Sequence, residues 1–189
     1  MLKRCVVLGL VCALLVVAGP LVLAKDSKAE EQAKVRETAQ KGLDKLYEVN
    51  PQSKGAIQKA AGYAVFSNFG MKILVAGGGS GKGLAVDNKT RKEVFMRMKE
   101  VQAGLGFGAK KFTLVWVFAT KDKLNQFINS GWEGGGQATA AAKTKDGGGA
   151  LQGAVPMGEG VWLYQLTDKG LALELTVKGT KYYKDDDLN

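Results

Sequence analysis

One stretch of this chain, residues 111–119, most constrains how it can fold. A strand with one solvated face alternates apolar and polar residues, but here both alternating sets are apolar. The pattern predicts a central strand covered on both faces, so the fold must supply strands beside it and packing layers above and below it. The two sets are Phe112, Leu114, Trp116 and Phe118 on one face, and Val115 and Val117 on the other.

Short strand-like segments surround this stretch and are separated by glycine clusters and turn residues. Because they follow one another with few long crossovers, we expect an antiparallel sheet. The 26 glycines exceed the usual share of roughly 7%, and several alternate along strands, which is typical of a strongly curved or barrel-like sheet. The segments are residues 63–69, 71–76, 83–87, 92–99, 101–107, 161–166 and 171–177.

Helical patterns lie mainly in the N-terminal part. Residues 25–49 carry a thin apolar stripe and end at Asn50-Pro51, and a shorter helix is expected over residues 53–61. A third helix, residues 121–130, interrupts the strands between a capping Thr120 and Gly131. We therefore predict one α+β domain: a mostly antiparallel, strongly curved or barrel-like sheet with N-terminal helices and one inserted helix.

The first 24 residues have the organisation of an export signal. Lys3 and Arg4 precede an uncharged run, and Val22 and Ala24 have the small-residue spacing that signal peptidases recognise. This predicts cleavage after Ala24, a single domain over residues 25–189, and an exported protein that is periplasmic or secreted. An uncleaved anchor remains the alternative, since about 20 apolar residues can span a bilayer.

The chain has no histidine, and its two cysteines, Cys5 and Cys12, both fall within the predicted signal. The usual general base, the thiolate nucleophile and the common zinc ligands are therefore missing from residues 25–189. We expect a protein that is not an enzyme. A hydrolase that uses carboxylates remains open, with Asp122, Glu133 and Glu159 as candidates.

Three motifs resemble known ligand-binding sequences, but each lacks residues or a structural context that the site requires. Residues 76–83 lack the first glycine and the final hydroxyl residue of a phosphate-binding loop, so a glycine-rich turn is expected there. Residues 104–109 fit a dinucleotide fingerprint but lie in a strand pattern. Residues 185–187 are three adjacent acids without the spacing of a calcium loop, and we expect them in a solvated tail. No cofactor and no metal site is predicted.

The charge points to the class of partner. The chain carries 27 Lys and Arg against 18 Asp and Glu, a net charge of +9. An exported basic protein meets few nucleic acids, so anionic lipid headgroups or envelope polymers are the expected partners. Positive charge that serves only solubility is the alternative.

Several blocks, in their order along the chain, resemble the SYLF domain. They are AGYAVF at residues 61–66, the glycine stretch at 77–83, AGLGFGA at 103–109, the helix around 124–128, the small residues at 137–142, GVWLY at 160–164, GLAL at 170–173 and the ending KGTKYYKDDDLN at 178–189. The resemblance implies a lipid-binding module without catalytic activity; eukaryotic members bind phosphoinositides and membranes, and fungal members also bind actin. Residues 91–99 depart from the family, whose members often carry Trp and Pro there.

Together these patterns predict a non-catalytic protein of the bacterial cell envelope that binds phospholipid or another anionic lipid, by peripheral membrane association. Lysines beside the first helix and the glycine block are the expected headgroup contacts: Lys41, Lys45, Lys110 and Lys111. Two alternatives remain, the carboxylate hydrolase and an envelope scaffold that binds protein.

Overall fold

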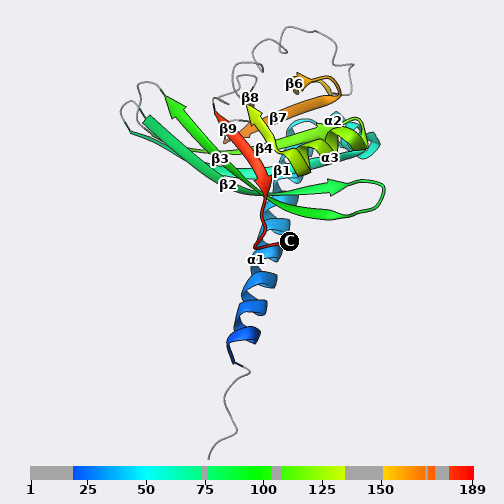
Figure 1. The fold of residues 1–189 in the computed structure, drawn as a ribbon. Coiled ribbons are helices and arrows are strands. Elements are labelled where there is room, and N and C mark those ends of the chain that lie inside the picture. Colours follow the sequence, from blue (N-terminus) through cyan, green and yellow to red (C-terminus); the bar gives the residue numbers. More distant parts are fainter. Residues whose placement is uncertain (1–18, 74–75, 104–107, 135–150, 169, 173–178) are drawn as a thin grey trace, which may run out of the picture.

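The computed structural model describes residues 19–73, 76–103, 108–134, 151–168, 170–172 and 179–189 (Figure 1). The helices are α1 (Gly19–Val49), α2 (Gln52–Lys59) and α3 (Lys121–Ser130). The strands are β1 (Gly62–Ile73), β2 (Ala76–Asp87), β3 (Glu93–Ala103), β4 (Gly108–Phe118), β5 (Trp132–Gly134), β6 (Val155–Gly158), β7 (Val161–Thr167), β8 (Gly170–Ala172) and β9 (Thr180–Lys184).

The strands form one antiparallel sheet of nine strands that curls into a half-barrel (Figure 1). Its order is β5-β9-β3-β2-β1-β4-β7-β6, with β8 paired to β7. The predicted α+β class with a curved antiparallel sheet is therefore confirmed. The doubly apolar stretch is indeed an inner strand, because β4 pairs with β1 on one side and with β7 on the other.

The two faces of this sheet bury separate cores. On the first, which we call the α1 face, the predicted apolar stripe of α1 packs against residues of the central strands that include Val65 of β1, Leu84 of β2 and Val115 of β4. On the opposite α3 face, Phe127 of α3 and Tyr182 of β9 meet Trp116, with ring centroids 5.2 Å apart in both pairs. This division explains why β4 is apolar on both sides over residues 114–118. The stripe residues, all buried, are Val35, Ala39, Leu43 and Leu46.

The third helix follows its sequence signals. Thr120 accepts a hydrogen bond from the Lys123 backbone N–H at 3.3 Å, as an N-cap does. Gly131 ends the helix with φ of 71°, a conformation that favours glycine. The helix is also held against the sheet by its apolar side, because Leu124 and Phe127 are both buried.

Several boundaries differ from the expectation. α1 begins at Gly19 rather than at residue 25, and Pro20 lies in its first turn, where a missing N–H costs little. β1 is one long strand where two were expected. The expected turn at residues 77–83 is wrong, because the glycines lie within β2 and pair with both β1 and β3. Residues 104–107 and 173–178 of the expected strands lie outside the described residues.

Glycine is required inside β2 because its neighbours approach closely. A Cβ on Gly83 would collide with the Val65 carbonyl oxygen and the Phe66 ring. Phe66 is fully buried and packs edge-on against Tyr182, with centroids 4.9 Å apart. The glycine therefore makes room for an aromatic ring on the α3 face.

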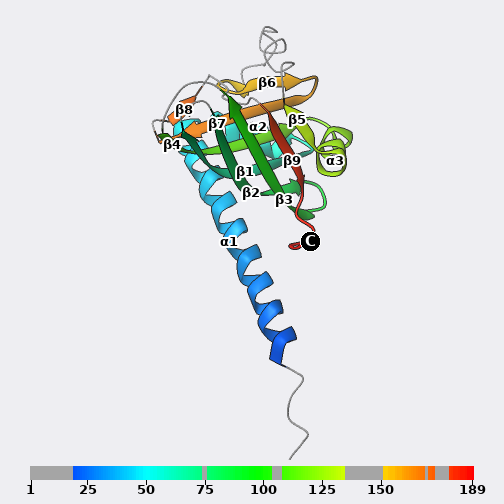
Figure 2. The ribbon, with the colours of Figure 1, turned by 60° about the vertical axis from the view of Figure 1, so that its left-hand side comes forward.

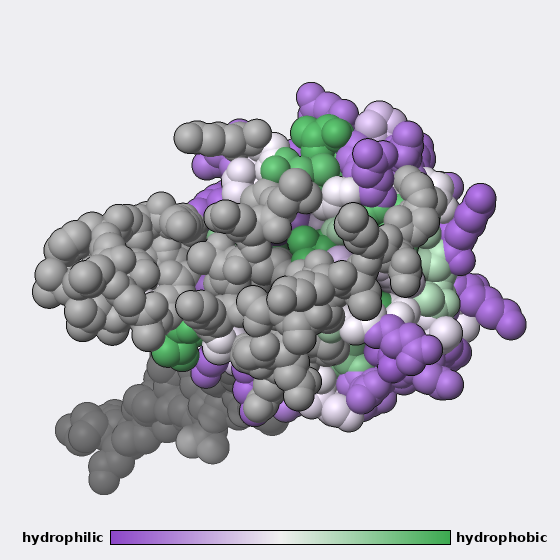
Figure 3. All heavy atoms as spheres, turned by 90° about the horizontal axis from the view of Figure 1, so that it is seen from above, coloured by the Kyte–Doolittle hydropathy of each residue, from purple (hydrophilic) through white to green (hydrophobic). Residues whose placement is uncertain are grey.

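The described residues on the face seen from above are mostly polar. Seen from the end opposite the N-terminal part of α1, hydrophilic side chains rim the described surface and apolar residues show only in small areas between them (Figure 3). Within the described residues, no helix has both the length and the apolar composition needed to cross a bilayer.

These contacts predict opposite effects for two alanine substitutions. Gly83→Ala should lower the free energy of unfolding by about 2 kcal/mol, because the added methyl overpacks the core. Gly55→Ala, in helix α2 with nothing within 4 Å of the added Cβ, should raise it by roughly 0.5–1 kcal/mol through helix propensity. Urea unfolding followed by circular dichroism measures both, and equal effects would contradict the packing argument.

Candidate functional site

Basic side chains gather in a groove on the α1 face, on the part of the sheet next to the N-terminal half of α1. The groove has a volume of about 560 Å³. We call it the basic groove and define it by its four cations, Lys82 of β2, Arg97 and Lys99 of β3, and Lys111 of β4, with Ser67 and Ser80 between them.

The antiparallel register brings these residues together. Lys82 lies opposite Ser67 of β1 on one side and Arg97 of β3 on the other. In the next row Ser80 lies opposite Lys99. Since side chains alternate between faces, residues in such rows share one face of the sheet. Lys99 and Lys111 stand on strands three spacings apart, which separates their columns by about 14 Å at ~4.8 Å per strand.

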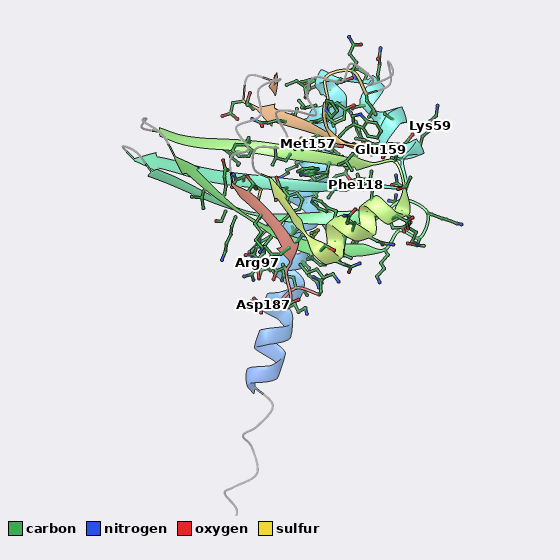
Figure 4. The ribbon with its side chains drawn as sticks, turned by 45° about the horizontal axis from the view of Figure 1, so that its top comes forward. Lys59, Arg97, Phe118, Met157, Glu159 and Asp187 are labelled. Atoms are coloured by element: carbon green, nitrogen blue, oxygen red, sulfur yellow. The ribbon has the colours of Figure 1, made fainter. Side chains whose placement is uncertain are left out.

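Carboxylates from other parts of the chain pair with two of the four cations. Arg97 Nε lies 2.7 Å from Asp185 Oδ2, and its Nη2 lies 2.7 Å from Asp187 Oδ2. Figure 4 shows Arg97 and Asp187 close together beside α1. Lys82 forms an ion pair with Glu31 of α1. The hydrogen bond to Asp185, followed by the other attractions of both carboxylates, raises the pKa of Arg97 above its ordinary value.

The other two cations face solvent more freely. The Lys99 ammonium lies 5.8 Å from the centre of the Tyr183 ring, within the range of a cation–π contact. Lys111 is exposed. The groove thus combines two solvent-facing lysines with two cations that already have internal carboxylate partners.

The expectation of a solvated acidic tail is wrong for Asp185, whose side chain is fully buried. The backbone after β9 continues along β3, where the Asp185 N–H donates to the Phe95 carbonyl at 3.0 Å. The Asn189 side chain accepts from the Phe95 N–H at 3.0 Å and donates to its carbonyl at 2.8 Å. These bonds hold the last residues against β3 next to Arg97.

The four lysines expected to contact headgroups do not form one cluster. Lys111 lines the basic groove. Lys41 pairs with Glu37 on the exposed side of α1 at 2.6 Å, and Lys45 donates to the Thr167 carbonyl at 2.9 Å. The backbone of Lys110 pairs with Gly70, and its side chain lies outside the described part of the chain.

Sequence reasoning missed Lys82, Arg97 and Lys99. Part of the signal is present in residues 92–99, where Arg97 and Lys99 alternate with the apolar Val94, Met96 and Met98. The missing step was the register of β2 against β3, which brings Lys82 into the same row as Arg97.

Two of the three carboxylates considered for hydrolysis are exposed to solvent. Asp122 in the first turn of α3 is exposed, and so is Glu159 in the turn between β6 and β7 (Figure 4). Neither has the buried, apolar surroundings in which catalytic acids are found. The Glu133 side chain lies outside the described residues. No cluster of three metal-ligating side chains occurs in the part that is described.

A second hollow of about 430 Å³ lies between α1 and the sheet, around Arg36, Tyr63 and Arg91. Glu93 neutralises Arg36 there, with 2.7 Å between Nε and Oε2. Partial burial raises the pKa of Tyr63 above its ordinary value. With Glu37 also in its lining, this hollow balances its charges and suits an anionic ligand less well than the basic groove.

Two comparisons relate this chain to known proteins. Residues 99–189 match the model of a family described as "Ysc84: Las17-binding protein actin regulator". "Beta cell expansion factor A" of Aeromonas veronii is 30% identical to this chain over 159 residues, which make up 84% of this chain and 59% of that relative. The chain therefore spans less than two thirds of the length of that relative.

Because Asp185 is buried, we expect the stability of the protein to depend more on Arg97 than on the exposed Asp187. Arg97→Met should lower the free energy of unfolding by about 3 kcal/mol, because it leaves a buried carboxylate without its cation. Asp187→Ala breaks only the exposed arm of the same cluster and should change stability by less than about 1 kcal/mol. Thermal and urea unfolding measure both, and equal losses would contradict the distinction drawn from burial.

Proposed function

We propose that this protein binds anionic lipid headgroups without catalysing a reaction, because residues 99–189 belong to the SYLF (Ysc84) family. Membership of that family supports a lipid-binding or an actin-regulatory role. The basic groove is the proposed contact surface. The observation that carries the proposal is the convergence of Lys82, Arg97, Lys99 and Lys111 on one face of the sheet.

The shape of the groove favours a lipid surface over a single small anion. Its solvent-facing lysines, Lys99 and Lys111, stand on columns about 14 Å apart, so each can meet a separate headgroup. An array of headgroups presents many negative charges, and each Lys or Arg close to such a surface contributes about 1 kcal/mol.

An apolar residue stands next to the basic rows. Val101 follows Lys99 by two positions on β3, so it belongs to the same face of the sheet. Its exposure is 69%, an unusual value for a valine within a strand. On a bilayer it would enter the headgroup region while the lysines meet phosphates, which suits peripheral association.

The cell envelope is the proposed location. This rests on residues 1–24, whose charged start, uncharged run and small residues before Lys25 have the pattern of an export signal. An exported protein does not meet cytoplasmic actin, so of the two roles that the family supports we propose the lipid-binding one, with phospholipid or another anionic lipid as partner.

Charge removal within the groove tests the proposal. Lys99→Gln with Lys111→Gln should weaken binding to vesicles of phosphatidylcholine and phosphatidylglycerol about 30-fold, since two contacts of ~1 kcal/mol each are lost. Co-sedimentation at increasing salt measures the affinity, and binding of the unchanged protein should also fall as the Debye length shortens to about 3 Å at 1 M.

The matched control is Lys59→Gln with Lys89→Gln, which removes the same charge from exposed positions away from the groove. It should weaken binding only slightly. Equal losses in the two double variants, or binding that ignores both salt and phosphatidylglycerol, would rule out the basic groove as the headgroup contact.

A further inference from the structure

The N-terminal part of α1 is held to the rest of the molecule differently from the C-terminal part. From Val35 onward the helix buries its apolar stripe on the sheet. Residues 27–34, which we call the polar segment, contain no buried side chain. Figures 1 and 2 both show α1 extending away from the sheet at this end.

The described contacts of the polar segment with the rest of the fold are polar. Lys28 Nζ donates to the Asn189 carbonyl at 2.8 Å, and Gln32 Nε2 donates to the Leu188 carbonyl at 2.7 Å. The third is the ion pair between Glu31 and Lys82, and it is the one that reaches into the basic groove. No apolar burial holds residues 27–34 in place, so separating them from the sheet exposes no core.

Glu31 and Asp185 differ in how readily a competing anion could replace them. The side chains of Glu31 and Lys82 are 46% and 40% exposed, and a solvated ion pair of this kind contributes little net stability. Asp185 is fully buried beside Arg97, so displacing it would strand a charge inside the protein. Arg97 therefore keeps Asp185 even where its exposed contact with Asp187 opens. Lys82, in contrast, can give up Glu31 without stranding a buried charge.

We propose that Glu31 is an internal competitor for the basic groove: lipid phosphate replaces its carboxylate on Lys82, and this exchange releases the polar segment of α1 from the sheet. The inference rests on the proposed lipid-binding function. Before binding, Glu31 lowers the effective positive charge of the groove; on a membrane, Lys82 joins Lys99 and Lys111 as a third headgroup contact.

Two neighbouring glutamates provide a matched test. Glu31→Gln and Glu30→Gln each remove one negative charge and one ion pair from the same helix, but Glu30 pairs with Lys34 in solvent, at 2.7 Å, and not with the groove. Glu31→Gln should lower the lipid concentration at half-binding about fourfold, and Glu30→Gln less than about twofold. The vesicles are those of phosphatidylcholine and phosphatidylglycerol.

The same two substitutions in a Lys82→Gln variant test whether the effect of Glu31 acts through Lys82. When Lys82→Gln is already present, adding Glu31→Gln should change the affinity no more than adding Glu30→Gln does, because the competition acts only through Lys82. Equal gains from Glu31→Gln with and without Lys82 would overturn the inference and reduce the effect to net charge. Melting by circular dichroism checks that each variant is folded.

Release of the segment has its own readout. Gln32→Ala removes an uncharged contact outside the groove, so it should tighten vesicle binding about twofold by loosening residues 27–34 without altering charge. An unchanged affinity would restrict the exchange to the Glu31 side chain and overturn the release of the helix segment.

The outcomes separate the two proposals. If the unchanged protein and the Glu31→Gln variant both ignore phosphatidylglycerol, the lipid-binding function fails and the competition fails with it. If the unchanged protein binds in a salt-dependent way but Glu31→Gln matches Glu30→Gln, only the competition fails. Added glycerol phosphate, tested up to concentrations that exceed the lipid, should not displace the protein; full displacement would assign the groove to single soluble phosphates.

Discussion

The register of the four central strands is the constraint on which the rest of this structure depends. It sorts each strand into two sets, one facing α3 and one facing α1. A shift of one residue in β3 would carry Arg97 and Lys99 to the apolar side and bring Met96 and Met98 out into solvent. The basic groove is therefore secured by the same hydrophobic burial that secures the fold, although none of its cations contributes to a core.

The spacing of apolar residues predicted burial within single segments, but it did not predict which segments pair with each other. Residues 111–119 and the stripe of α1 could be predicted because their burial follows from local spacing. The glycines of β2 were misread as a turn because the aromatic ring that requires Gly83 stands on the neighbouring strand β1, and local composition does not show that pairing. Strand β9 was missed because its pairing with β3 joins residues 80 to 88 positions apart.

The site depends on long-range pairing even more than the fold does. Lys111 was identified from its place beside the glycine block, but Lys82 and Arg97 face each other only because β2 and β3 align as they do. The last residues show the same limit. Three adjacent acids look solvated in the sequence, and only the return of the chain along β3 buries Asp185 beside Arg97. Charge composition led to the expectation of an anionic partner but did not locate the basic groove.

Burial distinguishes the Arg97–Asp185 ion pair of the groove from the Lys82–Glu31 pair. Arg97 and Asp185 form a fixed pair that anchors the chain after β9, because separating them would leave a charge in a dry environment. Lys82 lies in the same groove and pairs with Glu31 of α1, yet water reaches both partners and residues 27–34 contain no buried side chain. A surface built only from fixed pairs would offer an approaching membrane little charge, and one without internal partners would attract any anion. A groove with one pair of each kind keeps its geometry while one of its cations stays available for exchange.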